Sequence, residues 1–428
     1  MKVLHLTAHL GGGVGKALSG LIARASESDS GVQHLIVCLE GPEKSQFIDR
    51  ILRYGSHVIV CPTKDRLEKL MGDSDIVQLE WWNHPATIKC LCSLSARPIR
   101  LLTWSHVSGL HNPIIPQRLI LASHRFLFTS PCSYKSKEVK SLTPELADRL
   151  GVVCSSGGFC GLPQTRAQAN ENIAAGYIGS LGFAKLHPCY VDYIAAAKIP
   201  GFTVRMIGDP ANRDALNQQC DGLGKTGMLE FRGYSTDVAS ELAAINVLAY
   251  LLNPEHYGTT ENALLEAMAM GIMPIVLDNP CEQQIVEDRI TGLVVHSPGE
   301  FAEATQRLHE DPAERRRLGS QAAKSVRERF SVENMEASLN SHYREVLSMK
   351  KREVVFSEIF GTDPAEWFLS CQHDKSIFAD DGSIHLNGGD SLDYGLFENT
   401  KGTVFHFSEY FPDHLKLKLW ANNLKSLQ

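Results

Sequence analysis

One stretch of the sequence, residues 251–277, constrains the fold more than any other, because strand-like and helix-like segments follow one another there. It begins within an apolar run of strand length at residues 249–252, and the polar residues 253–260 that follow are typical of a loop. Residues 261–270 are rich in Ala, Leu, Met and Glu, which are strong helix formers. A second apolar run follows at residues 274–277. The pattern therefore predicts one βαβ unit.

The start of the predicted helix at residues 261–270 is suited to bind an anion such as a diphosphate. Free backbone N–H groups and the positive end of the helix dipole lie at a helix N-terminus. Glu266 lies five residues after Glu261, deeper in the helix, where its carboxylate could accept two hydrogen bonds from a ribose diol. In the structural alternative, Glu261 caps the helix and Glu266 is solvated. The spacing alone favours neither interpretation.

The residues GTTENALLEAMAMGIMPIV resemble the donor-binding motif of retaining glycosyltransferases of the GT-B fold, glycosyltransferase family 4, also called glycosyl transferases group 1. That motif is a Glu, seven residues and a second Glu, followed by Ala-Met-Ala and a Gly before a strand. Glu266 matches the second Glu, whereas Gly258 stands at the position of the first. Glu255 or Glu261 substitutes for that Glu, or the donor sugar is held differently. The resemblance implies that Glu261 is catalytic and that the donor is bound by Gly258, Thr259, Thr260, Asn262 and Glu266.

A second phosphate-binding turn is predicted near the N-terminus, where a first strand is followed by the glycine-rich residues 11–16 and then by a helical pattern. Glycine lets backbone N–H groups approach a phosphate closely. A P-loop ATPase would require Gly in place of Leu10 and Ser or Thr in place of Ala17, so the sequence disfavours that class. In the family that the chain resembles, this turn implies that Gly12 and Gly13 face the donor diphosphate. The alternative is a tight turn without a ligand.

Aromatic and polar side chains follow two further strands of the first half. Trp81, Trp82 and His84 come after the strand at residues 75–79, and ligands of open α/β sheets bind beyond the carboxyl ends of strands. We therefore expect these three side chains on the acceptor side, as a face on which a sugar stacks; the alternative is that the tryptophans are core residues. His106 follows the next strand, and the resemblance implies that it reaches the donor sugar as a catalytic residue. The alternative for His106 is a capping or buried histidine.

The second half begins with residues 152–163, where Gly and Pro concentrate as in a linker between domains. The alternation of strands and helices then restarts. The segment IGSLGFAK resembles the family's Gly-Arg-Leu-x-x-x-Lys segment, which implies that Gly179 and Lys185 bind the donor and that Lys185 is catalytic. Ser180 stands where the family often has Arg. Arg232 lies in a segment that resembles the one reading the nucleotide base, and it is the candidate to replace the missing cation.

A chain of 428 residues is longer than one hydrophobic core usually serves, so two or more domains are expected. The resemblance covers residues 1–350 and implies an α/β chain of the GT-B fold, with two Rossmann-like domains facing a cleft. The expected parts are an N-terminal acceptor domain at 1–160, a C-terminal nucleotide-sugar domain at 161–330, a crossover helix at 331–350 and a small C-terminal α+β appendage at 351–428. The appendage is too aromatic for disorder. It packs on the N-terminal domain, forms a dimer or holds the acceptor, and packing is the simplest role.

Composition and charge narrow the class of partner. Hydrophobic residues make up 43% of the chain and charged residues 21%, which is ordinary for a soluble protein, and no apolar run has the length of a membrane span. The net charge of −7 argues against binding nucleic acid, but it leaves room for a local basic patch and peripheral membrane contact. The 11 cysteines include no CxxC pair, so reduced thiols and a cytoplasmic location are expected. No metal is expected, because no Cys/His ligand spacing occurs.

The resemblance implies a glycosyltransferase of carbohydrate biosynthesis. The enzyme would move a sugar from a nucleotide-diphosphate sugar to a hydroxyl of a glycan, lipid-linked or small-molecule acceptor, with retention of configuration and without metal or cofactor. Helix N-termini and Lys would stabilise the leaving group. Two other classes stay open: a catalytically impaired nucleotide-sugar-binding protein, and another nucleotide enzyme such as an epimerase or ATPase. The sequence specifies neither the sugar, the nucleotide, the acceptor nor the oligomeric state.

Overall fold

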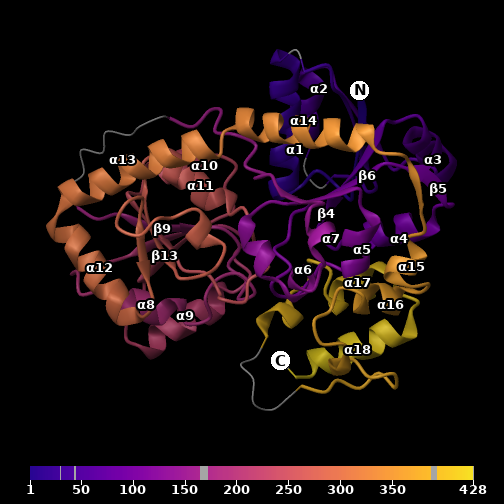
Figure 1. Ribbon diagram of the computed structural model, residues 1–428. Coiled ribbons are helices and arrows are strands. Elements are labelled where there is room, and N and C mark those ends of the chain that lie inside the picture. The colour runs from indigo at the N-terminus through magenta and orange to yellow at the C-terminus, as the bar shows by residue number, and fades with distance from the viewer. Residues whose placement is uncertain (29, 43–44, 164–171, 387–392, 428) are drawn as a thin grey trace. The chain divides into compact units, whose positions relative to one another are not determined.

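The computed structural model describes residues 1–428 except 29, 43–44, 164–171, 387–392 and 428 (Figure 1). The chain divides into two compact units, each with its own parallel sheet. Unit 1 consists of Met1–Gly158, Tyr257–Thr260 and Val332–Gln428, and unit 2 of Phe159–His256 and Glu261–Ser331. The chain therefore returns to unit 1 for its last helices.

The sheet of unit 1 contains seven parallel strands in the order β3-β2-β1-β4-β6-β7-β8. The strands are β1 (Lys2–Thr7), β2 (Gln33–Cys38), β3 (His57–Val60), β4 (Ile76–Trp81), β6 (Leu101–Ser105), β7 (Arg125–Phe128) and β8 (Leu150–Val152). The central strands are buried along their whole length, as is usual where helices cover both faces of a parallel sheet. The strand order reverses at β1 and β4. In open α/β sheets ligands bind beyond the carboxyl ends of the strands at such a point.

Helices cover both faces of this sheet. They are α1 (Gly12–Glu27), α2 (Gln46–Arg53), α3 (Lys64–Gly72), α4 (Pro85–Ser93), α5 (Gln117–Ala122), η1 (Pro131–Lys135), α6 (Lys137–Lys140), α7 (Pro144–Ala147) and α14 (Val332–Ser348). Leu18 of α1 and Leu339 of α14 share one hydrophobic core with the sheet. Ile88 of α4 and Leu119 of α5 belong to the other core. The polar side chains described below lie at the ends of strands that these two cores hold in place.

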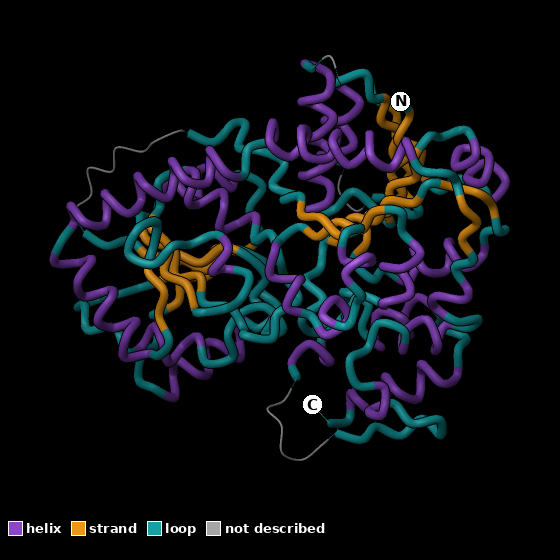
Figure 2. The backbone as a smooth tube through the Cα atoms, in the orientation of Figure 1, coloured by secondary structure: helices purple, strands orange, loops and turns teal. Residues whose placement is uncertain are grey.

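The sheet of unit 2 contains six parallel strands in the order β11-β10-β9-β12-β13-β14. The strands are β9 (Ala175–Ile178), β10 (Val204–Ile207), β11 (Leu229–Gly233), β12 (Val247–Tyr250), β13 (Met273–Leu277) and β14 (Leu293–Val295), and Figure 2 shows the strands of each unit gathered together among helices. The helices are α8 (Tyr190–Ala195), α9 (Arg213–Gly222), α10 (Val238–Ala243), α11 (Asn262–Ala269), η2 (Glu282–Gln284), α12 (Pro298–Glu310) and α13 (Pro312–Arg329). The predicted βαβ unit is confirmed as β12, α11 and β13.

Two parts of the chain form only short helical segments. Residues 137–147 form the two separate helices α6 and α7, because Pro144 lacks a backbone N–H and is accommodated only at a helix start. After β13, residues 282–284 form only the short turn η2. There Glu282 is fully buried, so its side chain belongs to the interior of unit 2 rather than to a solvated helix face.

The C-terminal appendage packs on the N-terminal part of unit 1. Its strand β15 (Arg352–Val354) pairs antiparallel with β5 (Arg97–Ile99). The other described elements are α15 (Ser357–Phe360), α16 (Pro364–Leu369), η3 (Lys375–Ile377), η4 (Tyr394–Phe397), α17 (Val404–Tyr410) and α18 (Leu415–Lys425). Phe368, Phe407 and Trp420 join the same hydrophobic core as Ile88 of α4. Among the described residues, no helix is long and apolar enough to cross a membrane.

Candidate functional site

Lys185 and Glu261, which were expected to act on the donor, form an ion pair inside unit 2. Lys185 Nζ lies 2.7 Å from Glu261 Oε2, and the Tyr250 hydroxyl at the end of β12 donates to the same oxygen at 2.6 Å. Glu261 is buried and precedes α11 with φ +47°, a left-handed conformation that is uncommon for residues other than Gly. Strained backbone of this kind clusters at functional sites. The geometry therefore brings together two of the three residues expected to be catalytic.

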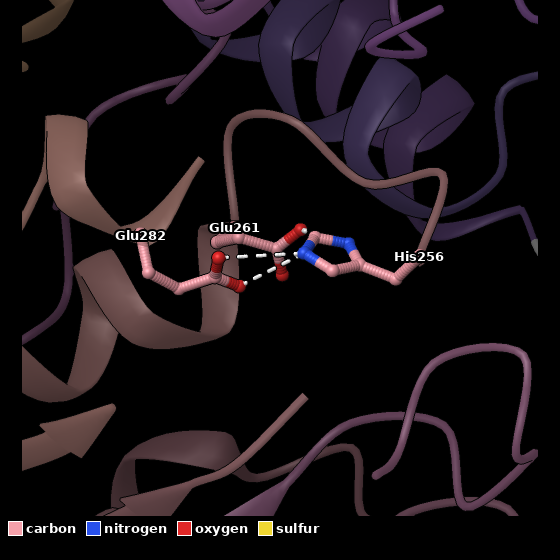
Figure 3. Close-up of side chains that lie close together, drawn as sticks. All are labelled: His256, Glu261 and Glu282. Carbon is pink, nitrogen blue, oxygen red and sulfur yellow. Dashed lines mark hydrogen bonds and ion pairs between the residues drawn. The ribbon is translucent and has the colours of Figure 1, made fainter. Parts of the chain in front are cut away.

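His256 and Glu282 extend this pair into a larger buried network (Figure 3). His256 Nε2 lies 3.1 Å from Glu282 Oε1, and its Nδ1 lies 3.8 Å from Glu261 Oε1. His256 belongs to the loop after β12, and Glu282 follows β13, the neighbouring strand. The carboxyl ends of adjacent parallel strands thus bring together residues that are far apart in the sequence.

The charges of this network compensate one another. Burial alone would raise the pKa of Glu261, but the Lys185 ammonium, helped by His256, holds it below its usual value. Burial likewise opposes protonation of His256, but the carboxylate of Glu282 raises the pKa of His256 above its ordinary range. The carboxylates of Glu261 and Glu282 therefore lie next to Lys185 and His256, an arrangement that keeps buried ions paired.

The three side chains in Figure 3 also offer one ligand atom each within 4.8 Å of one another, as a metal site would. A metal ion would have to displace the proton that Glu282 stabilises on His256 and would compete with the Lys185 ammonium for Glu261. The donor set therefore fits a proton and an ammonium better than a divalent metal. The sequence patterns gave no indication of His256, Glu282 and Tyr250, although all three lie at or after the ends of strands β12 and β13.

The remaining donor-binding candidates have different surroundings. Arg232, expected to replace the missing cation, is half-exposed and lies 3.9 Å from Glu241 rather than in the Lys185 network. Gly179 follows β9 with φ +151°, and its carbonyl packs so closely on Gly208 that a side chain at residue 208 would clash. Asn262 is the first residue of α11, and Glu266 is half-buried on the same helix. Asn262 and Glu266, which are expected at the phosphate and at the ribose, therefore lie on one helix.

The next candidates, Gly258, Thr259 and Thr260, are buried and belong to unit 1. The Thr129 hydroxyl donates to Thr259 Oγ1 at 3.0 Å, and the hydroxyls of Ser155 and Thr260 are hydrogen-bonded at 3.0 Å. Glu255, the alternative substitute for the first Glu of the family motif, is exposed, whereas Glu261 is buried. Between these two, the structure gives Glu261 the enclosed position.

Gly12 and Gly13 lie at the N-terminus of α1, after β1. Both are exposed, and Gly12 adopts φ +52°. Gly11, the N-cap residue, has no side chain with which to cap the first backbone N–H groups of this 16-residue helix. The turn therefore has the features that an anion-binding helix start requires.

His106 takes part in a chain of buried hydrogen bonds in unit 1. Its Nε2 lies 2.8 Å from Glu80 Oε2, the other oxygen of Glu80 lies 2.9 Å from His5 Nδ1, and His5 Nε2 lies 2.9 Å from His34 Nδ1. Burial would raise the pKa of Glu80, but the hydrogen bonds from the two imidazoles beside it hold it below its usual value. Gln78 adds a third bond to the carboxylate at 2.7 Å. His106 is thus oriented by Glu80 at the end of its strand.

The two adjacent tryptophans, Trp81 and Trp82, have different surroundings in the structure. Trp81 is fully buried in the core and stacks on Phe360 at 5.3 Å between ring centroids, so it offers no face to a sugar, contrary to the expectation for this residue. Trp82 is half-buried, and its ring contacts those of His84 and His106. Consecutive residues of a strand alternate between its two faces, which explains why only one of the pair lies in that core.

Parts of this chain are similar in sequence to known glycosyltransferases. Residues 165–325 match the family model "Glycosyl transferases group 1". The lipopolysaccharide core biosynthesis glycosyltransferase LpsE of Rhizobium meliloti (strain 1021) is 28% identical over 158 residues, which cover 36% of this chain and 44% of that protein. The alpha-D-kanosaminyltransferase of Streptomyces kanamyceticus is 23% identical over 229 residues, covering 52% and 54%. The chain thus spans about half the length of the curated relatives it matches.

Solved structures share the fold over most of the chain. Anabaena Alr3699/HepE in complex with UDP matches with a TM-score of 0.63 and 17% identity, covering 81% of this chain and 100% of that one. Sucrose-phosphate synthase from Thermosynechococcus elongatus matches with a TM-score of 0.59 and 15% identity, covering 81% and 100%. The predicted pair of Rossmann-like domains is confirmed. This chain has the GT-B fold, and its residues 165–325 match the glycosyl transferases group 1 model.

Proposed function

We propose that this protein is a glycosyltransferase that moves a sugar from a nucleotide-diphosphate sugar to an acceptor hydroxyl with retention of configuration, as in glycosyltransferase family 4. The observation that carries the proposal is the family match at residues 165–325, which contains both the Lys185–Glu261 pair and Glu266. Structural neighbours of this fold were solved with UDP and with UDP-glucose. A cytoplasmic location is part of the proposal, because all eleven cysteines are free, as in reducing compartments.

In this proposal, unit 2 binds the donor nucleotide. The first backbone N–H groups of α11 and the ammonium of Lys185 receive the diphosphate, and Glu266 accepts hydrogen bonds from the ribose. Glu261, with Tyr250 and His256 around it, holds Lys185 in place. A fixed ammonium needs no reorganisation when charge develops on the leaving oxygen, which is the basis of electrostatic catalysis.

The transfer step then proceeds by loss of the diphosphate. The bond between the anomeric carbon and the diphosphate oxygen breaks, the bond from that carbon to the acceptor oxygen forms, and the departing diphosphate takes the acceptor proton. No protein base is then required. His106, oriented by Glu80, is proposed to hydrogen-bond a hydroxyl of the sugar.

Metal independence is also proposed, and the charge balance of the His256–Glu261–Glu282 group supports it. Lys185 and His256 already pair with the two carboxylates that a divalent ion would otherwise bind. Activity should persist after EDTA treatment and dialysis, with metal content followed by elemental analysis. Loss of activity that added Mg²⁺ or Zn²⁺ restores would contradict this part of the proposal.

A panel of UDP-, GDP- and ADP-sugars tests the proposal directly. Binding is measured by titration calorimetry, transfer by product analysis with a mixed acceptor panel, and the anomeric configuration of the product by NMR. We expect one nucleotide class to bind and its sugar to reach an acceptor with retention. Binding without transfer would favour the catalytically impaired binding protein, sugar interconversion an epimerase, and ATP hydrolysis without sugar transfer an ATPase.

A further inference from the structure

Five rings from three segments of unit 1 gather beyond the carboxyl ends of β1 and β4. We call this set, His9, Trp82, His84, His406 and Tyr410, the ring cluster. The ring centroids of His9 lie 5.5 Å from Trp82 and 5.4 Å from His84. The ring of His84 lies 4.7 Å from His406 and 6.4 Å from Tyr410. The appendage therefore supplies two of the five rings, from α17.

The position of the ring cluster is the one where an open α/β sheet binds ligands. The strand order of unit 1 reverses at β1 and β4, and the loops after these strands carry His9 and His84. His9 lies two residues before Gly11, the N-cap of α1. Trp82 also lies 6.5 Å from the ring of His106. The ring cluster thus lies next to His106, which is proposed to hydrogen-bond a hydroxyl of the sugar.

Attachment of the appendage does not account for this polar cluster. The appendage is already attached by apolar contacts and by a strand pair, since Phe360 stacks on Trp81, Phe407 and Trp420 are fully buried in the shared core, and β15 pairs with β5. The cluster adds imidazoles that burial keeps neutral: burial lowers the pKa of His84 to about 2 and that of His406 to about 4. Apolar side chains would fill the same space without polar ring nitrogens that need hydrogen-bond partners.

The hydrogen bonds of the two histidines fix their tautomers. His406 Nδ1 accepts a bond from the Gly402 N–H at 3.1 Å, and His84 Nδ1 accepts one from the Ala86 N–H at 3.2 Å. In their neutral forms both rings therefore carry the proton on Nε2, as donors. Tyr410 is hydrogen-bonded to the carboxylate of Glu40. The same carboxylate lies 3.5 Å from His84 Nε2, so His84 and Tyr410 are held by Glu40. The aromatic faces of Trp82 and Tyr410, together with the Nε2–H donor of His406, match the C–H faces and hydroxyl groups of a sugar.

We propose that the C-terminal appendage completes a carbohydrate-binding subsite for the acceptor, in which His406 and Tyr410 contact an acceptor sugar together with Trp82, and the buried His84 packs against the ring of His406. This inference rests on the proposed glycosyltransferase function and adds the class of acceptor and the source of its contacts. The appendage is then part of the enzyme's specificity and not a packing element alone.

Ligand-detected NMR with the full chain tests the subsite, using maltose, cellobiose and lactose as probes. We expect at least one disaccharide to bind. His406→Ala should weaken that binding about tenfold, which is 1.4 kcal/mol, and Tyr410→Phe should weaken it less because the ring stays. The matched control is His373→Ala, which removes an exposed histidine of the appendage that contacts Lys137 instead of the cluster.

UDP binding, measured by calorimetry on the same variants, separates this inference from the proposed function. Unchanged UDP affinity and unfolding temperature with weakened disaccharide binding in His406→Ala would support the subsite. Failure of all three disaccharides to bind, or equal affinity for the His406→Ala and His373→Ala variants, would overturn it while leaving the donor side intact. If His406→Ala unfolds, His406→Gln gives the same comparison with the acceptor of the Gly402 N–H retained.

Discussion

Both units bury ionisable side chains at the carboxyl ends of their strands, but they compensate the charge differently. In unit 2 two carboxylates, Glu261 and Glu282, face the Lys185 ammonium and His256, whose pKa Glu282 raises. In unit 1 the single carboxylate of Glu80 accepts hydrogen bonds from two imidazoles and an amide. Removing a member of the first network leaves a buried charge without its partner, whereas removing a distal member of the second leaves a neutral group unsatisfied. Removing a residue from the unit 2 network should therefore lower the unfolding free energy more than removing a distal residue from the unit 1 network.

The largest effect on stability is therefore expected for Glu282→Gln, which removes the carboxylate that keeps His256 charged. Breaking a buried ion pair by loss of one partner costs about 3–5 kcal/mol in unfolding free energy. Chemical denaturation at pH 6 measures it. Glu300→Gln is the matched control, because Glu300 pairs with His296 on the surface at 2.9 Å and such exposed pairs are worth about 1 kcal/mol or less. Equal losses in the two variants would contradict the buried network.

The same network predicts how stability depends on pH. The pKa of His256 is raised in the folded chain, so its stabilisation is complete below the unfolded value of about 6.5 and is lost as the pH rises through the folded pKa. The wild-type chain should lose unfolding free energy above neutral pH. Glu282→Gln should flatten this decrease, and denaturation curves from pH 6 to pH 9 measure it. An unchanged slope in the variant would show that His256 is not the titrating group.

Lys185→Ala should have the largest effect on catalysis. The loss of one group that stabilises a departing oxyanion commonly costs about 2.7–4 kcal/mol, so kcat should fall roughly 10²–10³-fold. Donor affinity should fall less, because the charge on the leaving oxygen grows in the transition state. Transfer kinetics are compared with those of Lys198→Ala, which removes an exposed lysine of the same unit. A kcat within about threefold of wild type would remove Lys185 from the mechanism.

Glu266→Ala should act on nucleotide binding with a smaller effect. If its carboxylate holds the ribose diol, UDP affinity should fall by about 1.5–3 kcal/mol, the range for hydrogen bonds to a charged group. Titration calorimetry with UDP measures this, and Glu303→Ala on the exposed face of α12 is the control. UDP affinity equal to that of the control would leave Glu266 as a half-buried helix residue without a role in binding.

The sequence predicted the elements better than the surroundings of their side chains. The alternation of apolar runs and helix formers is local, so it located the helix that begins after Glu261 and the strands on either side of it. It did not reveal that Lys185 lies against Glu261, because this contact depends on how β9 and β12 pair. The sequence pattern did not indicate the contact of Glu282 with His256 for the same reason, since His256 comes from the loop after a different strand.

The two tryptophans show the same limit at closer range. Adjacent residues at a strand end project to opposite faces, and the sequence does not state which face the core occupies. Trp81 entered the core because the aromatic appendage covers that face, and Trp82 remained in the ring cluster. The family resemblance ends before the appendage, so nothing in it could indicate that α17 supplies His406 to the same place.

The smallest effect is expected for His34→Gln. His34 is the last residue in the series of hydrogen bonds that runs from His106 through Glu80 and His5. His5 Nδ1 must donate to Glu80, so His5 Nε2 accepts from His34 Nδ1 when both imidazoles are neutral. Burial, followed by the neighbouring His5, lowers the pKa of His34 well below its ordinary value, which keeps His34 uncharged. Only one neutral hydrogen bond is then at stake, worth about 1 kcal/mol in unfolding free energy.

We expect kcat to stay within about twofold of wild type, because Glu80 orients His106 without help from His34. His106→Gln provides the comparison in the same kinetic assay. An equal loss of kcat in His34→Gln and His106→Gln would contradict this expectation. It would mean that the hydrogen bonds from His34 through His5 and Glu80 to His106 carry a proton during turnover, and that Glu80 does more than orient His106.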